Sequence, residues 1–378
     1  MADFEATVVD VASDGRGVVK HPDGRTVFVG GVWPGEKGRF RITDNKGNVA
    51  IAQLCELLLA SPHRVEAPCP HHGVSESSCG ACPWQFVSYT AQLDAKQQRV
   101  QQAFARIGVK QVNDILPSSK HFHYRNRAQF KTDGQQLGFV GAKSNSLAAI
   151  SQCMVLSDPN AATLQNLLQQ LPNPTWKPTR KQLWTTLDID DSLAIGEVSV
   201  NQRLPFRQAN DEQNTAMKSW LAKKLEPLDK SARVLELFCG SGNLTQVIAE
   251  QGFEEILAVE AVEEALLQLD ALNLPKVTSF KQNLFLDTAF EAIYRELNKP
   301  DILVLDPPRD GLKNKAKMFR KKNKFSHIFY IACDLMTLVR DVKQFQEEGY
   351  KVREVQALDQ FPQTPHIELM VHMSAKNA

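Results

Sequence analysis

The chain has 378 residues, of which 43% are hydrophobic and 23% charged, and its 44 Lys and Arg side chains nearly balance 43 Asp and Glu. This length allows two or three domains with sizeable cores, and the composition is typical of soluble globular proteins. A net charge of +1 does not predict a nucleic-acid partner, so such a site would have to come from local clusters of basic residues. The sequence shows no export signal and no apolar run of about 18 residues, which predicts a cytoplasmic protein without a membrane span.

Residues 1–60 alternate short β-rich runs, such as residues 25–31 and 38–44, with turn clusters rich in Gly, Asp and Pro. Several short strands with regular turn signals predict a compact β-barrel. A unit of this size is too small to be an enzyme by itself, so we expect it to act as a binding domain.

Residues 61–205 begin with an irregular segment that contains three cysteines, and an amphipathic helix pattern follows over residues 91–108. Between residues 120 and 200, strand-like runs alternate with polar turns, and a Pro-rich stretch interrupts them. We expect a central α+β domain here.

From residue 206 to residue 378, strand and helix patterns alternate. Apolar strand patterns at residues 233–238, 301–306 and 326–332 are separated by helical patterns. This alternation predicts an α/β domain with a doubly wound, mostly parallel sheet that binds ligands at the carboxyl ends of its strands.

The strand at residues 233–238 leads into a turn that contains Gly240 and Gly242. Glycines let the backbone approach a ligand closely, but Thr245 replaces the third glycine of a dinucleotide-binding fingerprint. The next strand ends at Glu260, where an acid can bind the hydroxyl groups of a ribose. The two features together favour a nucleoside cofactor; the alternative is an ordinary turn and a surface glutamate.

Asp306 follows an apolar strand and precedes Pro307 and Pro308, which fix the backbone and leave no amide donors in the turn. We therefore expect Asp306 to project into the ligand crevice, the alternative being an aspartate that only caps a turn.

Two segments are rich in basic residues. Residues 313–324 contain seven Lys or Arg and no acid, and residues 120–131 interleave Lys, His and Arg with three aromatic residues. Such clusters can bind phosphates and stack bases, although solvated or half-buried protein faces have the same composition.

The seven cysteines are odd in number and no export signal accompanies them, which argues against a disulfide framework. Cys79 and Cys82 form a C-x-x-C pair, with Cys69 upstream and Cys153 downstream. Four thiolates can hold a zinc ion or an iron–sulfur cluster, and the spacing leaves the metal open. A redox-active pair is the alternative, but the irregular surrounding chain argues against it. Cys333 stands instead between an apolar strand and a helix pattern, which raises the question of what its thiol attacks.

Several motifs together resemble those of the iron–sulfur-containing RNA (uracil-5-)-methyltransferases, and the resemblance extends over nearly the whole chain. The most specific are, in order, LFCGSGN at 237–243, DPPRDG at 306–311, ACDLMTLVRD at 332–341 and FPQTPHIE at 361–368. FRQAN at 206–210 and the cysteine pattern also match.

The resemblance implies three domains: a TRAM-type, OB-like RNA-binding barrel at 1–60, a central α+β domain with an iron–sulfur cluster at 61–205, and a Rossmann-like class I methyltransferase domain at 206–378. It implies S-adenosylmethionine and a [4Fe–4S] cluster as cofactors. The cluster ligands would be Cys69, Cys79, Cys82 and Cys153.

The activity that the resemblance implies is methylation of C5 of a uridine in RNA, with 23S rRNA as the expected substrate and transfer RNA as the alternative. Cys333 would attack C6 of the uracil, and Glu368 would remove the C5 proton. The residues expected to position the substrate are Phe206, Gln208, Asp306 and Arg127. The residues expected to bind S-adenosylmethionine are Gln208, Phe238, Gly240, Gly242, Glu260, Asn283 and Asp306. We expect a monomer without an obligate protein partner.

Three positions depart from the family pattern without removing a reacting group. Asp334 follows the nucleophile where the family has Asn, Asn283 stands where an acid is commoner, and Cys69 is farther from Cys79 than in the family pattern. Two other functions are the alternatives. A methyltransferase acting on an exocyclic amine would keep the cofactor turn without needing a Cys and a Glu in these positions. A non-catalytic iron–sulfur protein that binds RNA would not bind S-adenosylmethionine.

Overall fold

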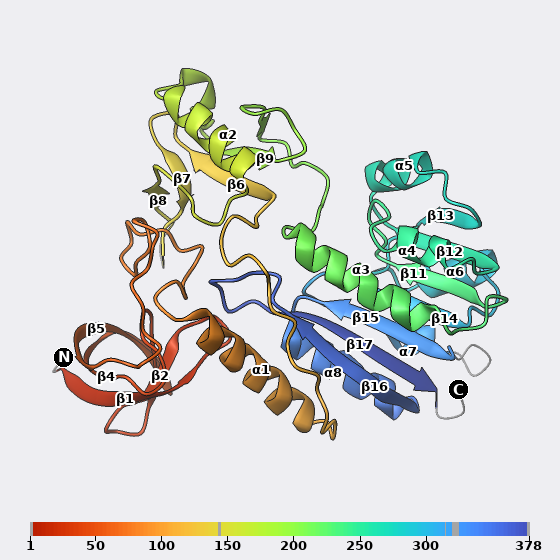
Figure 1. Ribbon diagram of the computed structural model, residues 1–378, viewed down its shortest axis with the longest axis horizontal. Helices are drawn as coiled ribbons and strands as arrows, with labels where there is room; N and C mark the ends of the chain where they lie inside the picture. Colours follow the sequence, from red (N-terminus) through yellow and green to blue (C-terminus); the bar gives the residue numbers. More distant parts are fainter. Residues whose placement is uncertain (1–2, 143–144, 314, 320–324, 376–378) are drawn as a thin grey trace. The chain divides into compact units, whose positions relative to one another are not determined.

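The computed structural model describes residues 3–142, 145–313, 315–319 and 325–375. These fall into two compact units (Figure 1). Unit 1 comprises Met1–Lys96, Ser119–Leu204 and Phe361–His366, and unit 2 comprises Gln97–Ser118, Pro205–Gln360 and Ile367–Ala378. The units do not follow the order of the chain, since residues 97–118 belong to unit 2 and residues 361–366 belong to unit 1.

The N-terminal part of unit 1 is a closed five-stranded β-barrel with the strand order β1-β2-β3-β5-β4, which confirms the predicted barrel. Its strands are β1 (Phe4–Val11), β2 (Gly17–Lys20), β3 (Thr26–Val29), β4 (Lys37–Lys46) and β5 (Val49–Leu59). Side chains alternate between the interior and the surface, so that Val8, Val19 and Phe40 meet in an apolar core. Closure leaves the barrel without free sheet edges.

The buried carboxylate of Glu36 fixes the exit from this barrel. It accepts hydrogen bonds from the backbone amides of Trp33 at 2.8 Å and Ser61 at 3.2 Å, and from the Arg64 guanidinium at 2.6 Å. The guanidinium of Arg64 also lies 4.6 Å from the ring centre of Phe86. A fully paired buried charge of this kind ties the segment after the barrel to the barrel itself.

The rest of unit 1 contains an antiparallel sheet with the strand order β10-β9-β6-β7-β8. The strands are β6 (Arg127–Thr132), β7 (Leu137–Val140), β8 (Leu147–Ala149), β9 (Thr185–Asp190) and β10 (Ser199–Val200). Helix α2 (Asp158–Gln169) packs on it through Leu164 and Leu167, and a short 3-10 helix, η1 (Pro174–Trp176), closes the same core. Helix α1 (Tyr89–Ala105) begins in unit 1 and continues into unit 2.

Unit 2 is built on a seven-stranded sheet with the order β13-β12-β11-β14-β15-β17-β16. The first five of these strands are parallel neighbours, whereas β17 runs antiparallel to both β15 and β16. The strands are β11 (Arg233–Leu237), β12 (Glu255–Glu260), β13 (Val277–Lys281), β14 (Ile302–Leu305), β15 (His327–Ala332), β16 (Tyr350–Leu358) and β17 (Glu368–Ala375). The architecture is the predicted α/β arrangement with a doubly wound, mostly parallel sheet.

Helices cover both faces of this sheet (Figure 1). The helices of unit 2 are α3 (Asp211–Leu225), α4 (Thr245–Glu250), α5 (Glu263–Ala271), α6 (Ala289–Glu296), α7 (Lys315–Met318) and α8 (Leu335–Glu347). Side chains of α3 and α4 share one apolar core with the sheet, and side chains of α6 and α8 share another. Because both faces are covered, a central strand such as β14, with the sequence ILVL, is buried at every position.

Within the described ranges, the helices all fall short of the length and apolarity that a membrane crossing requires. The basic segment predicted at residues 313–324 lies partly outside the described residues, which omit positions 314 and 320–324.

Candidate active site

The carboxyl ends of the parallel strands and the amino end of β17 lie at one edge of the unit 2 sheet. Ala332 is paired with Leu369 across the antiparallel β15–β17 ladder, so the next position in this register places Cys333 opposite Glu368. Leu305, the last residue of the neighbouring strand β14, pairs with Tyr330, which puts Asp306 at the same edge. The order and register of the strands therefore bring Asp306, Cys333 and Glu368 to one edge of the sheet.

Cys333 is the residue between β15 and α8, and it is half-buried. The next residue, Asp334, caps α8 by accepting a hydrogen bond from the Thr337 amide at 2.8 Å, so the helix begins directly after the thiol. Burial raises the pKa of the Cys333 thiol to about 11, and the negative charges of Glu368 and Asp306 act in the same direction. Arg309 opposes them by its charge and by a hydrogen bond to the sulfur. Arg309 is therefore a cation that can stabilise a thiolate at this position.

Glu368 is the first residue of β17 and is 3% exposed. Burial raises the pKa of this carboxyl well above its usual value, and the charge of Asp306 raises it further. A buried carboxyl beside the candidate nucleophile is in a position to exchange a proton with a bound substrate.

Asp306 follows β14, and its amide donates a 3.4 Å hydrogen bond to the carbonyl of Leu237 at the end of β11. Burial raises the pKa of this carboxyl also. Pro307 and Pro308 follow, so the turn offers its side chains rather than its amides to a ligand.

The predicted cofactor turn follows β11 and is built from unusual backbone conformations. Phe238, Gly240 and Gly242 all have positive φ, at 61°, 54° and 94°. A methyl group at Gly242 would meet a Leu269 side-chain carbon at 2.7 Å, whereas the space beside Gly240 is open to 4 Å. The turn is therefore packed on its inner side and accessible at Gly240, which suits close approach of a ligand to the backbone.

Glu260, at the end of the neighbouring strand β12, organises this turn. Its carboxylate accepts hydrogen bonds from the amide of Gly240 at 3.2 Å, and from those of Ala261 at 2.7 Å and Val262 at 3.1 Å. The carboxylate thus lies beside the turn at the position where an acid meets a ribose in this architecture.

Glu236 is a candidate functional residue that the sequence analysis missed. It lies on β11 and is 1% exposed, and neither of its carboxylate oxygens has a hydrogen-bond partner among the described residues. Burial raises its pKa to about 8, partly offset by the nearby hydroxyl of Thr245. The signal in the sequence was a single acid inside the otherwise apolar run VLELF. An unpartnered carboxyl beneath the cofactor turn fits the donor groups of a bound ligand.

The remaining residues predicted near the substrate and cofactor have different environments. Gln208 is buried, and its side-chain oxygen accepts a 3.2 Å hydrogen bond from Gln360, which follows β16. Phe206 is 69% exposed. Asn283 is exposed and caps a turn by accepting a hydrogen bond from the Phe285 amide at 3.0 Å.

Arg127 lies in unit 1, at the start of β6. Its guanidinium binds both carboxylate oxygens of Asp188 on β9, at 3.2 and 2.6 Å, and also the carbonyl of Leu204. The pair is almost fully buried, so the guanidinium holds together two strands and the chain that follows β10. A contact between Arg127 and a substrate stays a prediction.

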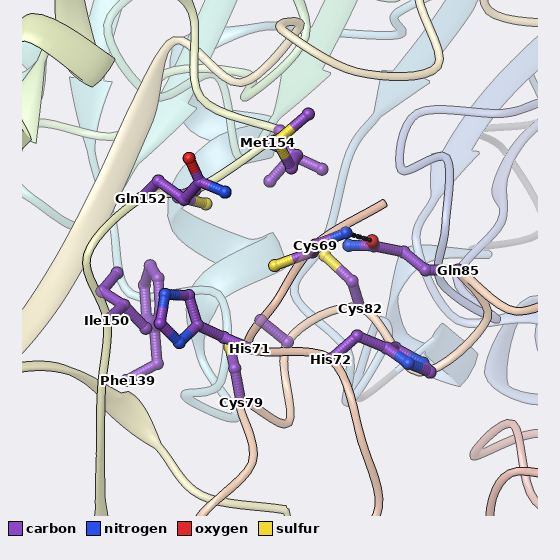
Figure 2. A pocket seen from close by; sticks show the side chains of 13 residues that line it. Cys69, His71, His72, Cys79, Cys82, Gln85, Phe139, Ile150, Gln152 and Met154 are labelled. Carbon is purple, nitrogen blue, oxygen red and sulfur yellow. Dashed lines mark hydrogen bonds between the residues drawn. The ribbon is translucent and has the colours of Figure 1, made fainter. Parts of the chain in front are cut away.

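Four cysteines line one cavity in unit 1 (Figure 2). They are Cys69, Cys79, Cys82 and Cys153. Together with two histidines and several apolar side chains, they surround about 350 Å³ of space that no atom fills, part of it open to solvent. Burial raises the pKa of Cys82 to about 12, and the charges of Cys153 and Cys79 add to this effect. These three thiols are therefore close enough to interact electrostatically.

The described cysteines do not form a recognised site for a single metal ion. In the part of the chain that the structure describes, no group of three His, Cys, Asp or Glu side chains is close enough to hold a single metal ion. A tetrahedral zinc site would need its four sulfurs about 2.3 Å from one centre.

Comparison with known proteins identifies relatives of the whole chain. An RNA methyltransferase of Nitrosomonas europaea, described as uncharacterized, is 39% identical over 97% of this chain and 95% of its own length. The 23S rRNA (uracil(1939)-C(5))-methyltransferase of Shewanella amazonensis is 31% identical over 94% of this chain and 92% of its own length. The chain belongs to the RNA (uracil-5-)-methyltransferase family. The family description tRNA (Uracil-5-)-methyltransferase matches residues 288–376 of this methyltransferase, a range that includes Asp306, Cys333 and Glu368.

The fold of this methyltransferase is also that of a solved structure. The tRNA (uracil-54, C5)-methyltransferase of Pyrococcus abyssi, in complex with S-adenosyl-L-homocysteine, superposes with a TM-score of 0.73 over 98% of this chain and 99% of that one. The two sequences are 20% identical, so the likeness concerns the fold.

Proposed function

We propose that this enzyme methylates C5 of a uridine in RNA with S-adenosylmethionine, through a covalent bond between the Cys333 sulfur and C6 of the uracil. The observation that carries the proposal is the position of Cys333 opposite Glu368 at the sheet edge that also presents the cofactor turn. An amine-directed methyltransferase would need neither a nucleophile nor a base at these places.

The chemistry assigns a separate task to each residue. The Cys333 thiolate, stabilised by Arg309, adds to C6 and makes C5 nucleophilic. When bound, S-adenosylmethionine supplies the methyl group that C5 takes up. Glu368 then accepts the proton from C5, and the electron pair of that C–H bond restores the C5–C6 double bond as the Cys333 sulfur leaves. The product is 5-methyluridine, and both Cys333 and Glu368 are ready for another cycle once the proton has been released.

Asp306, Gln208 and Phe206 are proposed to position the base. Asp306 lies in the neighbourhood of both Cys333 and Glu368, where a carboxyl can bond the polar edge of the uracil. Gln208 is held in place by Gln360, and Phe206 offers an exposed ring on which a base can stack. The Arg127 guanidinium binds Asp188. We propose that Arg127 contributes to substrate binding indirectly, by stabilising the unit 1 sheet that carries part of the basic segment 120–131.

The methyl donor is proposed to bind beside the cofactor turn. Phe238, Gly240 and Gly242 shape the turn, Glu260 is placed to meet the ribose, and Asn283 follows the neighbouring strand β13 at the same edge. The unpartnered carboxyl of Glu236 beneath the turn supports a ligand there.

We propose large-subunit ribosomal RNA as the substrate, because a relative with that printed specificity is 31% identical over nearly the whole chain. Transfer RNA is the alternative, supported by the family match and by the Pyrococcus abyssi fold. The alignment to the Shewanella enzyme spans 420 positions, more than the 378 residues of this chain, so that relative carries segments that are missing here. A uridine must leave its stack to reach Cys333, so a loop or unpaired segment is the expected target.

The TRAM-type barrel and the segment at 120–131 are proposed to contact this RNA. We further propose that the enzyme acts in the cytoplasm as a monomer.

The four cavity cysteines are proposed to hold a [4Fe–4S] cluster. The support is that Cys69, Cys79, Cys82 and Cys153 line one cavity, because four cysteine thiolates are the usual ligands of such a cluster. Such a group would link the segment around residues 69–82 to the chain at Cys153 and so stabilise this part of unit 1. Iron and sulfide analysis of anaerobically purified protein tests this, and zinc without sulfide would contradict it.

The function is tested by incubating the purified enzyme with S-adenosylmethionine and separate transcripts of 23S rRNA segments and of transfer RNA. Nuclease digestion followed by mass spectrometry is expected to find 5-methyluridine in one transcript. A methyl group on an exocyclic amine would support the amine-directed alternative, and failure of calorimetry to detect S-adenosylmethionine binding would support a non-catalytic protein.

A further inference from the structure

The loop Phe361–His366, which precedes the proposed base Glu368, is part of unit 1, whereas Glu368 begins β17 of unit 2. Only Ile367 separates the loop from Glu368. The loop is thus the segment that leads directly into the proposed base.

Gln363 is the centre of the contacts that hold this loop. Its carbonyl accepts a 3.0 Å hydrogen bond from the Trp84 amide, and its own amide donates to the side-chain oxygen of Gln92 at 2.9 Å. The Gln92 side-chain amide in turn donates to the side-chain oxygen of Gln363 at 2.9 Å. The same Gln92 nitrogen also bonds the carbonyls of Trp84 and Val87, so that Gln92 joins the loop to the segment before α1.

Further contacts fix the beginning of the loop. Lys96 donates to the carbonyl of Phe361 at 3.3 Å, and Tyr124 donates to the carbonyl of Pro362 at 3.1 Å. The Trp84 indole donates to the carbonyl of Gly15 at 3.0 Å, which anchors the holding segment to the barrel. These side chains are deeply buried, including a lysine that is 0% exposed.

The loop is also held in a conformation that it would not adopt freely. Gln363 has φ of 70°, in the left-handed region, where a non-glycine residue is strained and persists only when its surroundings impose it. The hydrogen bonds that the Gln363 carbonyl forms with the Trp84 amide, and the Gln363 amide with the Gln92 side chain, supply that constraint. Strain of this kind is typical of segments whose position matters for function.

We propose that Trp84, Gln92 and Lys96 are positioning residues, which hold the loop Phe361–His366 so that Glu368 meets the C5 proton of the covalent intermediate. This inference rests on the proposed function. Because Glu368 acts after methyl transfer, loosening the loop slows only the last step, and the enzyme remains bonded to methylated RNA through Cys333.

The same contacts connect the loop to the cysteine cavity. Trp84 comes two residues after Cys82, and the neighbouring Gln85 accepts a 3.3 Å hydrogen bond from the amide of Cys69 (Figure 2). A group held by these cysteines would order Trp84 and the neighbouring residues that form hydrogen bonds with Gln363. We therefore expect the order of the loop to depend on the state of the cysteine cavity.

The first test uses Gln92→Met, which has a similar length but cannot form the four hydrogen bonds. Gln98→Met is its matched control, since Gln98 is an exposed residue of the same helix. Each variant, Glu368→Gln and the wild type are mixed with substrate RNA and S-adenosylmethionine. The protein–RNA adduct that survives denaturing electrophoresis is then quantified, and its RNA is examined for the transferred methyl group.

We expect Gln92→Met and Glu368→Gln to accumulate methylated adduct about tenfold to a hundredfold above the wild type and Gln98→Met. If Glu368→Gln accumulates adduct while Gln92→Met behaves like the wild type, the positioning role is wrong and the proposed function survives. If no protein forms an adduct, the proposed function itself is wrong.

The second test uses wild-type protein and does not depend on a variant that folds. Hydrogen exchange at the Gln363 amide is measured before and after the iron is removed by chelation under anaerobic conditions. Faster exchange in the iron-free protein, about tenfold or more, is expected if the cavity orders the loop. Equal exchange rates would contradict the link between the cavity and the loop.

Discussion

The hydroxyl of Tyr330, on the strand that leads to Cys333, donates a 2.7 Å hydrogen bond to the buried carboxylate of Asp341 on α8. The same carboxylate accepts from the Leu312 amide at 3.3 Å and from the Arg340 guanidinium at 2.9 Å. Leu312 follows the DPPRDG motif, so Asp341 joins the strand, the helix and the acid turn that surround the nucleophile. A methyl group at Gly311 would meet the Asp341 carboxylate at 2.6 Å, which explains why a glycine is needed beside it.

Replacing Asp341 is expected to weaken the fold more than replacing its partner. Asp341→Ala removes a buried acceptor with three donors and is predicted to lower the free energy of unfolding by about 3 kcal/mol. Tyr330→Phe leaves the other two bonds and is predicted to cost about 1 kcal/mol. Urea unfolding measures both, and equal losses would argue against Asp341 as the centre of this network.

The reactivity of Cys333 is expected to depend on pH and on Arg309. With the thiol pKa raised to about 11, the thiolate fraction of the free enzyme grows about tenfold for each pH unit between pH 7 and pH 10. Alkylation of Cys333 by iodoacetamide, followed by peptide mass spectrometry, is therefore predicted to accelerate over this range without levelling.

Arg309→Met removes the cation that favours the thiolate, so Cys333 is expected to be alkylated several-fold more slowly than in the wild type at pH 9. Lys313→Met, which alters an exposed cation of the same loop, serves as the control. An unchanged rate in Arg309→Met would show that another group stabilises the sulfur.

Glu236 is predicted to make stability depend on pH. The pKa of its carboxyl is about 8 in the folded protein, against 4.5 for an ordinary exposed glutamate, so the folded state binds the proton more tightly than the unfolded chain. The contribution to stability is full below pH 4.5 and is lost as pH rises to 8, at up to about 1.4 kcal/mol per pH unit. Glu236→Gln is expected to unfold with a shallower pH dependence and to bind S-adenosylmethionine more weakly by calorimetry. Parallel pH profiles for variant and wild type would contradict this assignment.

Much of the fold was predictable because burial leaves a pattern in the sequence. The run ILVL of β14 could only be a strand covered on both faces, and the alternation in residues 1–60 predicted the barrel. The strand Gly17–Lys20 was missed, because its four residues stand between turn sequences. Helix α3 begins at Asp211, several residues before its apolar pattern, because the Asn210 side chain caps it by accepting from the Gln213 amide.

The candidate site was predictable only in its parts. Motifs indicated Cys333 and Glu368 separately. Their position opposite each other depends on the antiparallel register of β15 and β17, which no local pattern encodes. The hydrogen bonds between Gln92 and Gln363 join residues that are 271 positions apart, and no sequence pattern near either residue predicts this contact. Glu236 was missed because an acid in an apolar strand has no periodic signature.

The most direct test of the central claim is a trapping experiment with RNA in which the target uridine is replaced by 5-fluorouridine. Fluorine cannot be removed as the C5 proton is, so the covalent intermediate should persist after methyl transfer. Peptide mass spectrometry is predicted to find the methylated nucleotide bonded to Cys333, and a Cys333→Ala variant is predicted to form no adduct. Attachment at another residue, or wild-type rates of methylation by Cys333→Ala, would contradict the account.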